Sequence, residues 1–184
     1  MAAARDSFAK LGFERSTNRE IAAAAGVTAA AMYRHFESKP DLYAAVVQEA
    51  TSELVPVLRR AVAEQASARA AFRALILAQE AFDDRQRTAA GFLAELPTEM
   101  QRHPQVAARM LANPGEVFTI LNNIVDLGVR SGEIPAPKAQ RAVSVMIASF
   151  MGITAYANTL GPSLGKQATA GFLDLIDDAL FAAP

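Results

Sequence analysis

The sequence of 184 residues contains no cysteine. This absence excludes disulfide scaffolds, thiolate zinc sites and cysteine nucleophiles together. An excess of charge of one sign is missing as well, because 18 Lys and Arg residues stand against 19 Asp and Glu residues. No overall electrostatic field therefore draws the protein to nucleic acid or to a membrane, and any nucleic-acid-binding surface must be local.

Long hydrophobic runs are also missing. The longest apolar stretch, residues 143–156, is interrupted by serine, glycine and threonine, and it is shorter than the ~20 residues that a membrane span needs. Near the N-terminus, Arg5 and Asp6 come before any apolar core of a signal peptide. We therefore expect a cytoplasmic protein that has no membrane partner.

The residues that are abundant favour helices. Ala, Leu, Glu, Gln and Arg dominate, apolar residues recur at spacings of three and four, and no segment alternates as a strand does. The predicted fold class is all-α, with a first domain of three short helices in residues 1–45 and a larger helical domain in residues 46–184. Prolines separate the predicted helices, except that Pro56 should kink or divide the helix predicted for residues 41–66.

Residues 12–43 carry helix start and stop signals at close spacing. Thr17 followed by Glu20 predicts a capping box and hence a helix start, and Gly26 can end that helix in the left-handed conformation. Thr28 can cap a next helix that runs to about Phe36. Two short helices joined by a turn that contains glycine form a helix-turn-helix.

The residues around these two helices support the same prediction. Ser38 with Asp41 repeats the capping pattern, and Pro40 is tolerated because it falls in the first turn of the following helix. Apolar residues of the segment are expected to form a small core, and they are Phe8, Phe13, Ile21, Val27, Met32 and Phe36.

A series of short motifs in this segment resembles the DNA-binding domain of the TetR (tetracycline-repressor-like) family of transcriptional regulators. In chain order the motifs are Gly12-Phe13, Ser16-Thr17, Ile21-Ala22, Ala25-Gly26-Val27-Thr28, Met32-Tyr33, His35-Phe36 and Ser38-Lys39. Seven matches in this order over about 30 residues make the resemblance specific. The rest of the chain is similar to the family in length, helix content and layout.

The resemblance implies which residues touch DNA. Positions that usually contact phosphates correspond to Thr17, Thr28, Tyr33, His35 and Lys39, and positions that face base edges correspond to Asn18, Ala29 and Ala30. The chain departs from the family pattern at Ala30, where glycine is common, and at Ala31, where a hydroxyl is common. Alanines cannot hydrogen-bond a base, so we expect apolar contacts with thymine methyl groups, and a hydrogen bond from Asn18 to adenine.

Apolar stripes in the larger domain are the candidate effector site. The stripes and their polar interruptions comprise Phe72, Ile76, Gln79, Phe82, Phe92, Leu96, Phe118, Leu121, Asn122, Val125 and Tyr156. They are consistent with a cavity for a mostly apolar small molecule, and equally with an ordinary packed core. The buried amides and the phenol need polar partners, which a ligand can supply.

No motif predicts an enzyme, a metal site or a cofactor. Glu95, Glu99 and His103 are spaced at four-residue intervals, but Pro97 lies among them, and a solvated surface is the favoured interpretation. No serine or acidic pair stands in a recognisable catalytic setting.

Two long helices, predicted for residues 138–160 and 165–181, have more apolar surface than one packing partner needs. In the family such helices pair across a twofold axis, and the candidate dimer residues are Val145, Ser149, Ile153, Phe172, Ile176 and Leu180. Folding back within one subunit is the alternative.

The sequence therefore predicts a homodimeric DNA-binding regulator, a repressor that a small, mostly apolar ligand releases from a palindromic operator. One alternative is a regulator without a small-molecule ligand, controlled by a protein partner. Another is an all-helical carrier or enzyme whose N-terminal helices only pack.

Overall fold

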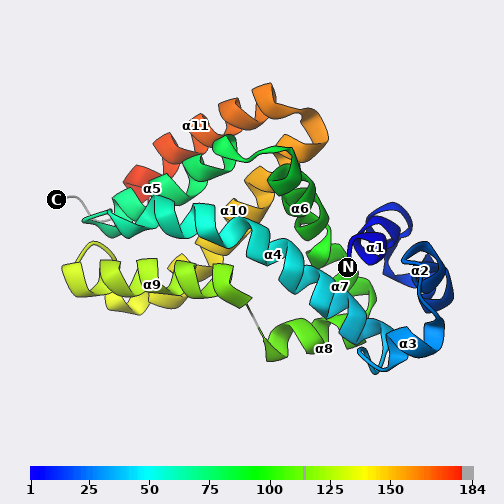
Figure 1. Ribbon diagram of the computed structural model, residues 1–184. Coiled ribbons are helices and arrows are strands. Elements are labelled where there is room, and N and C mark those ends of the chain that lie inside the picture. Colours follow the sequence, from blue (N-terminus) through cyan, green and yellow to red (C-terminus); the bar gives the residue numbers. More distant parts are fainter. Residues whose placement is uncertain (114, 180–184) are drawn as a thin grey trace.

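A computed structural model describes residues 1–113 and 115–179, and within these residues all regular structure is helical (Figure 1). The all-α prediction is confirmed. In chain order the elements are α1 (Ala2–Arg15), α2 (Asn18–Ala24), α3 (Ala29–Tyr33), α4 (Lys39–Ala63), α5 (Ala68–Ala78), the 3-10 turn η1 (Gln79–Ala81), α6 (Asp84–Ala94), α7 (Leu96–Arg102), α8 (Pro104–Ala112), α9 (Gly115–Ser131), the 3-10 turn η2 (Ala136–Lys138), α10 (Ala139–Leu160) and α11 (Pro162–Ala179).

The predicted caps start the short helices. Thr17 accepts the backbone N–H of Glu20 at 3.2 Å, and Thr28 accepts that of Ala31 at 3.1 Å. The Glu20 carboxylate does not reach back to the backbone, because it accepts the Thr17 hydroxyl at 2.6 Å. Each threonine still satisfies one backbone donor that the first helical turn leaves free.

We call α1, α2 and α3 the headpiece. Its core contains Phe8, Phe13, Ile21 and Met32, as predicted. Phe36 is half-buried and packs against this core, whereas Val27 lies outside it, because 48% of its surface is exposed. The Val27 backbone N–H closes the inter-helix turn on the Ala22 carbonyl at 3.0 Å, so this residue belongs to the turn and not to the inward face of either helix.

Helix α1 is interrupted at Gly12, where the backbone has φ 74°. Such a positive φ is readily adopted by glycine and strained for other residues. Beyond the interruption, the Ser16 hydroxyl donates to the Gly12 carbonyl at 2.8 Å, and the side chain of Ser16 is buried. The interruption turns the last residues of α1 toward α4 and α7.

Helix α4 joins the headpiece to the remaining helices, which we call the body (α5 to α11). It begins at the Ser38 cap and continues through Pro56, so of the two predicted outcomes, a kink or a division, the division does not occur. The side chains around the proline, Leu54, Val55 and Leu58, are buried, and their packing stabilises the helix. Pro56 has no N–H to donate to the Ser52 carbonyl, but both residues are exposed, so water can hydrogen-bond this carbonyl. The predicted boundary between residues 45 and 46 falls inside this helix.

The body packs around α4. Helices α5, α6, α8 and α9 contact α4, and α10 packs against α6, α9 and α11. Fully buried side chains between them include Leu58, Phe72, Leu75, Leu121 and Met146. This core fixes the surface on which the headpiece rests.

The segment 136–160, which holds η2 and α10, is long and apolar enough to cross a membrane by length and composition. This is weak evidence of a span, because core helices of other proteins meet the same criterion. The serine, glycine and threonine residues that interrupt the apolar stretch 143–156 do not break the helix, because all of them lie within α10. Only 22% of its most apolar window is buried inside the chain.

Candidate nucleic-acid interface

Helices α2 and α3 lie at one end of the molecule, away from α5, α9 and α11, and no other helix of the described residues covers their outer side (Figure 1). On α3 and around it, Thr28, Ala30, Tyr33 and His35 are exposed, and Tyr33 has 52% of its surface in solvent. Thr17 is exposed at the start of α2. These five residues therefore share an accessible end of the headpiece.

Three other candidates face the protein more than the solvent. Ala29 is half-buried and packs against the headpiece core. Asn18 is half-buried as well, and its Oδ1 is buried without a hydrogen-bond partner among the described residues. An Asn18 contact with adenine requires this side chain to turn outward.

Lys39 is held within the free protein. Its Nζ donates to the carbonyls of Glu14 at 3.0 Å and Ser16 at 2.9 Å, and it lies 4.4 Å from the centre of the Phe13 ring. The ammonium thereby satisfies carbonyls at the end of α1. An ammonium has three N–H donors, so one remains for a phosphate.

Acidic and basic side chains join the headpiece to the body, and sequence reasoning missed them. Glu99 of α7 accepts the backbone N–H of Phe13 at 3.3 Å, just after the interruption in α1. His103 lies with Nε2 3.4 Å from Glu99 and Nδ1 3.6 Å from Glu14, and its ring is 4.9 Å from that of Phe13.

The expectation that Glu99 and His103 form a solvated surface is wrong, because both side chains pack against α1 and only 13% of each is exposed. Glu95 is exposed, as expected. No group of three or more His, Asp or Glu residues in the described part of the chain is arranged to hold a metal ion.

A second ionic contact lies near the start of α1. Arg5 Nη1 is 2.9 Å from Glu53 Oε1 on α4, and Arg85 Nη2 on α6 is 3.0 Å from the same oxygen. Burial disfavours the Glu53 charge, but the hydrogen bonds from Arg85 and Arg5 outweigh burial and lower the pKa of this carboxyl group. Arg109 of α8 pairs with Asp41 of α4 at 2.9 Å. Charged side chains thus fix the headpiece at two places, and the Arg109–Asp41 pair holds the start of α4 against α8.

The predicted effector residues do not gather around one cavity. Six of them are packed in the core, and these are Phe72, Ile76, Phe82, Phe92, Leu121 and Val125. Leu96, Gln79 and Asn122 are half-buried, whereas Phe118 and Tyr156 are exposed. Aromatic and aliphatic stripes of this kind also build plain cores, which the sequence pattern cannot distinguish.

The polar candidates differ in how they are satisfied. Asn122 Nδ2 donates to the Phe118 carbonyl of its own helix at 2.8 Å. Gln79 accepts a short hydrogen bond from the Thr154 hydroxyl, while its Nε2 is buried without an acceptor among the described residues. Gln79 is therefore the interior polar group that a ligand would satisfy best.

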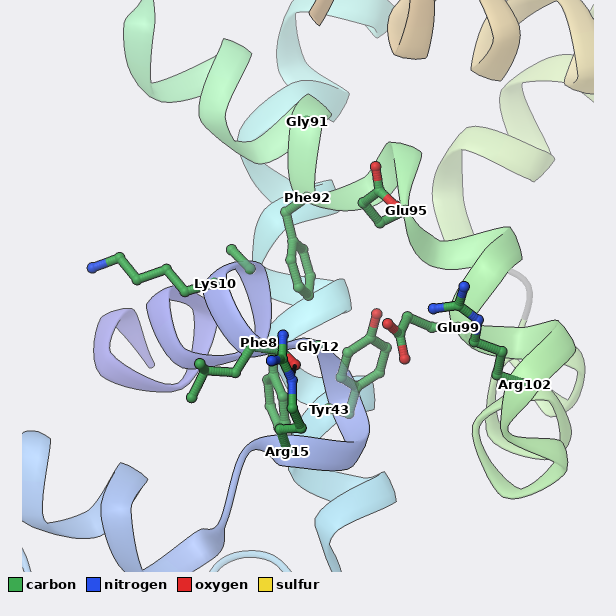
Figure 2. A pocket seen from close by; sticks show the side chains of 12 residues that line it. Phe8, Lys10, Gly12, Arg15, Tyr43, Gly91, Phe92, Glu95, Glu99 and Arg102 are labelled. Carbon is green, nitrogen blue, oxygen red and sulfur yellow. Dashed lines mark hydrogen bonds between the residues drawn. The ribbon is translucent and has the colours of Figure 1, made fainter. Parts of the chain in front are cut away.

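Two hollows open on the described surface. One, of about 460 Å³, lies between α9 and α10 and includes Phe118, Asn122 and Val125. The other, of about 370 Å³, lies between α1, α4, α6 and α7 and includes Phe92 (Figure 2).

The candidate dimer residues split between surface and interior. Val145 is 42% exposed and Ser149 half-buried on α10, but Ile153 and Ile176 are buried and Phe172 packs edge-on against Phe72 within the same chain. Leu180 lies outside the described residues. Further apolar side chains exposed on α10 and α11, outside the candidate dimer set, are Tyr156, Leu160, Leu164 and Leu175.

Comparison with known proteins agrees with this architecture. Residues 1–46 match the family described as "Bacterial regulatory proteins, tetR family". The chain is 33% identical over 108 residues to the HTH-type transcriptional activator FasR of Mycolicibacterium smegmatis, an alignment that covers 59% of this chain and 48% of that protein. The chain thus spans about half the length of this curated relative.

Solved structures share the fold over nearly the whole chain. A transcriptional regulator from Rhodococcus sp. Rha1 has a TM-score of 0.74 at 21% identity, covering 100% of this chain and 96% of that one. FadR from Bacillus subtilis, solved in complex with stearoyl-CoA, has a TM-score of 0.67 at 18% identity, covering 92% of this chain and 93% of that one. Residues 1–46 are thus similar to the tetR family of bacterial regulatory proteins, and the chain as a whole shares its fold with these solved regulators.

Proposed function

We propose that this protein is a cytoplasmic, sequence-specific DNA-binding transcriptional regulator that acts as a homodimer. The observation that carries the proposal is the uncovered α2–α3 unit, with Thr28, Ala30, Tyr33 and His35 exposed at one end of the molecule. A recognition helix must be free to enter the major groove, and α3 is free.

Selection of bound duplexes from a random pool tests this function. A regulator of this kind returns a palindromic motif with half-sites about one helical turn apart. Its affinity must fall with rising salt, because phosphate contacts release counterions. A carrier or an enzyme whose N-terminal helices only pack returns no motif, and that result would refute DNA binding.

A dimer follows from the proposed function because a palindrome needs two recognition helices. The supporting observation is apolar surface on α10 and α11, where Val145, Tyr156, Leu160 and Leu175 are exposed. A second copy of the chain would cover this surface. Dimerisation would therefore explain why α10 is apolar although little of it is buried within its own chain.

We further propose that a small, mostly apolar ligand controls DNA binding. Two observations support it: FadR of Bacillus subtilis was solved with stearoyl-CoA, and Gln79 has an unpaired donor inside the body. The ligand would shift the dimer between two spacings of its recognition helices, with a coupling of roughly 1–3 kcal/mol. We propose that the protein acts as a repressor, although the relative FasR is named an activator.

A regulator without a small-molecule ligand is the second candidate. It is favoured by four predicted effector residues that are packed in the core and line neither hollow, namely Phe72, Ile76, Phe82 and Leu121. Titration of DNA affinity with long-chain acyl-CoA separates the two. If acyl-CoA binds the protein and the DNA affinity is unchanged, control by acyl-CoA is excluded.

A further inference from the structure

The hollow between the headpiece and the body has the size and lining of a small-molecule site. Its volume of about 370 Å³ falls in the range usual for ligand pockets. Three aromatic rings form its wall, and the Tyr43 ring lies 4.9 Å from that of Phe8 and 5.6 Å from that of Phe92, centre to centre. The cavity thus offers aromatic surface to an apolar body of about one ring.

Two carboxylates lie one helical turn apart along this cavity. Glu95 ends α6 and Glu99 belongs to α7, and both line the cavity (Figure 2). The side chain of Glu95 makes no ion pair or hydrogen bond within the described part of the chain. Three basic side chains, Lys10, Arg15 and Arg102, also line the cavity. Lys10 extends away from Tyr43 and Arg102 lies beyond Glu99 as seen from Tyr43 (Figure 2), and the Nε of Arg15 donates to the Leu11 carbonyl at 3.0 Å.

The Tyr43 hydroxyl is the polar group at the inner end. Tyr43 is 1% exposed, its hydroxyl points to the side of the cavity where Glu99 lies, and it makes no hydrogen bond with any described residue. Burial first, and then the charges of Glu99 and Glu95, raise the pKa of Tyr43.

We propose that this cavity binds an organic cation that has a primary ammonium group on an aromatic body. The ammonium donates to the carboxylates of Glu95 and Glu99 and to the Tyr43 hydroxyl oxygen, and charge-assisted hydrogen bonds of this kind are the strong ones. The aromatic body packs on Phe8 and Phe92, and the rings attract the cation in addition.

The same ligand would act on the headpiece. Glu99 holds the backbone N–H of Phe13 at 3.3 Å, four residues before the Thr17 cap of α2. An ammonium bound to Glu99 competes for this carboxylate and loosens the contact between α7 and α1. This effect on DNA binding rests on the proposed function, but ligand binding itself does not.

Calorimetric titration of the full chain without DNA tests the site. The probes are 2-phenylethylamine, the neutral 2-phenylethanol and the anionic phenylacetate, which share one ring and differ in charge. We expect the amine to bind about tenfold or more tightly than either analogue, since only the amine makes charged hydrogen bonds. Equal binding of the alcohol, tighter binding of the anion, or no binding of the amine overturns the proposal.

Two variants locate the bound amine. Glu95→Gln removes one carboxylate that has no partner in the described chain, and we expect about tenfold weaker amine binding. The matched control is Glu64→Gln, an exposed residue at the far end of α4, which leaves the affinity unchanged. Equal affinity of Glu95→Gln and the parent protein overturns the site. Absence of a shift in the Phe13 amide resonance on amine binding overturns the link to the headpiece.

Discussion

Glu53 is the side chain at which α1, α4 and α6 meet. Its carboxylate is almost buried and accepts from Arg5 and Arg85, so Glu53→Gln leaves a partly buried guanidinium without its charged partner. We expect the free energy of unfolding at pH 7 to be about 1–3 kcal/mol lower in the variant than in the parent protein. Urea denaturation measures this difference.

The pH dependence of the Glu53 contribution has a defined sign. The folded-state pKa lies below the ordinary value of 4.5, so the stabilisation is fully present above pH 4.5 and is lost as the pH falls through the lowered pKa. The gap in unfolding free energy between the parent protein and Glu53→Gln should therefore shrink below pH 4.5. A gap that widens in acid would contradict the assignment.

Tyr33 carries the clearest prediction for DNA contact. Its hydroxyl is available on the exposed end of α3, and a phosphate oxygen can accept from it. Tyr33→Phe should weaken binding to operator and to unrelated duplex alike, by about 1 kcal/mol. Thr119→Ala, which removes an exposed hydroxyl of α9, is the control. A loss confined to particular base pairs would instead make Tyr33 a base-reading residue.

At the residue scale, local signals were readable from the sequence and distant partners were not. Thr17, Thr28 and Ser38 cap helices because their acceptors and donors are three residues apart. The contact between Glu99 and Phe13 joins residues 86 apart, and no periodicity encodes such a distance. For the same reason, the commitment of Lys39 to the end of α1 could not be foreseen.

At the scale of elements, α9 and α5 approach closely at Gly128. A Cβ built on Gly128 would lie 2.7 Å from Ile134 Cδ1 and 2.9 Å from the Ala68 Cβ. We expect Gly128→Ala to destabilise the fold by about 1–3 kcal/mol in spite of its better helix propensity. Gly91→Ala in α6 is the matched control, because its Cβ would meet Asn158 at an ordinary 3.6 Å. Thermal unfolding compares the two, and equal midpoints would refute the close packing.

A side chain from outside the helix completes the start of α5. The two oxygens of Glu133 accept the backbone N–H groups of Ala68 and Arg69, each at 3.0 Å. Burial works against the charge, yet these bonds and the Ser131 hydroxyl lower the pKa of Glu133. The sequence predicted helices from their own residues, and this contribution comes from a loop more than 60 residues away.

At the scale of the whole molecule, the oligomeric state decides whether two recognition helices act together. Val145→Asp places a charge on the exposed apolar surface of α10, and we expect the dimer to dissociate at least about tenfold more readily. Leu111→Asp on α8 is the control, an exposed leucine on a helix that does not pack against α10. Sedimentation velocity over a dilution series measures both. A monomeric parent protein would remove the proposed dimer.

The helical class and the headpiece could be predicted because they depend on local composition and caps. The effector and dimer residues could not be assigned as well, since the sequence shows which faces of a helix are apolar and not which neighbour covers them. Ile153 and Ile176 illustrate this, because both are covered by the chain itself.

The undivided α4 has a consequence for protein engineering. Helix α4 has 25 residues; it begins next to the headpiece and ends among the body helices. Because residue 45 lies inside this helix, the first 45 residues are not a detachable module. A chimaera that exchanges DNA sequence specificity between relatives should therefore have its fusion point after Ala63, so that the transferred headpiece keeps its own α4 helix.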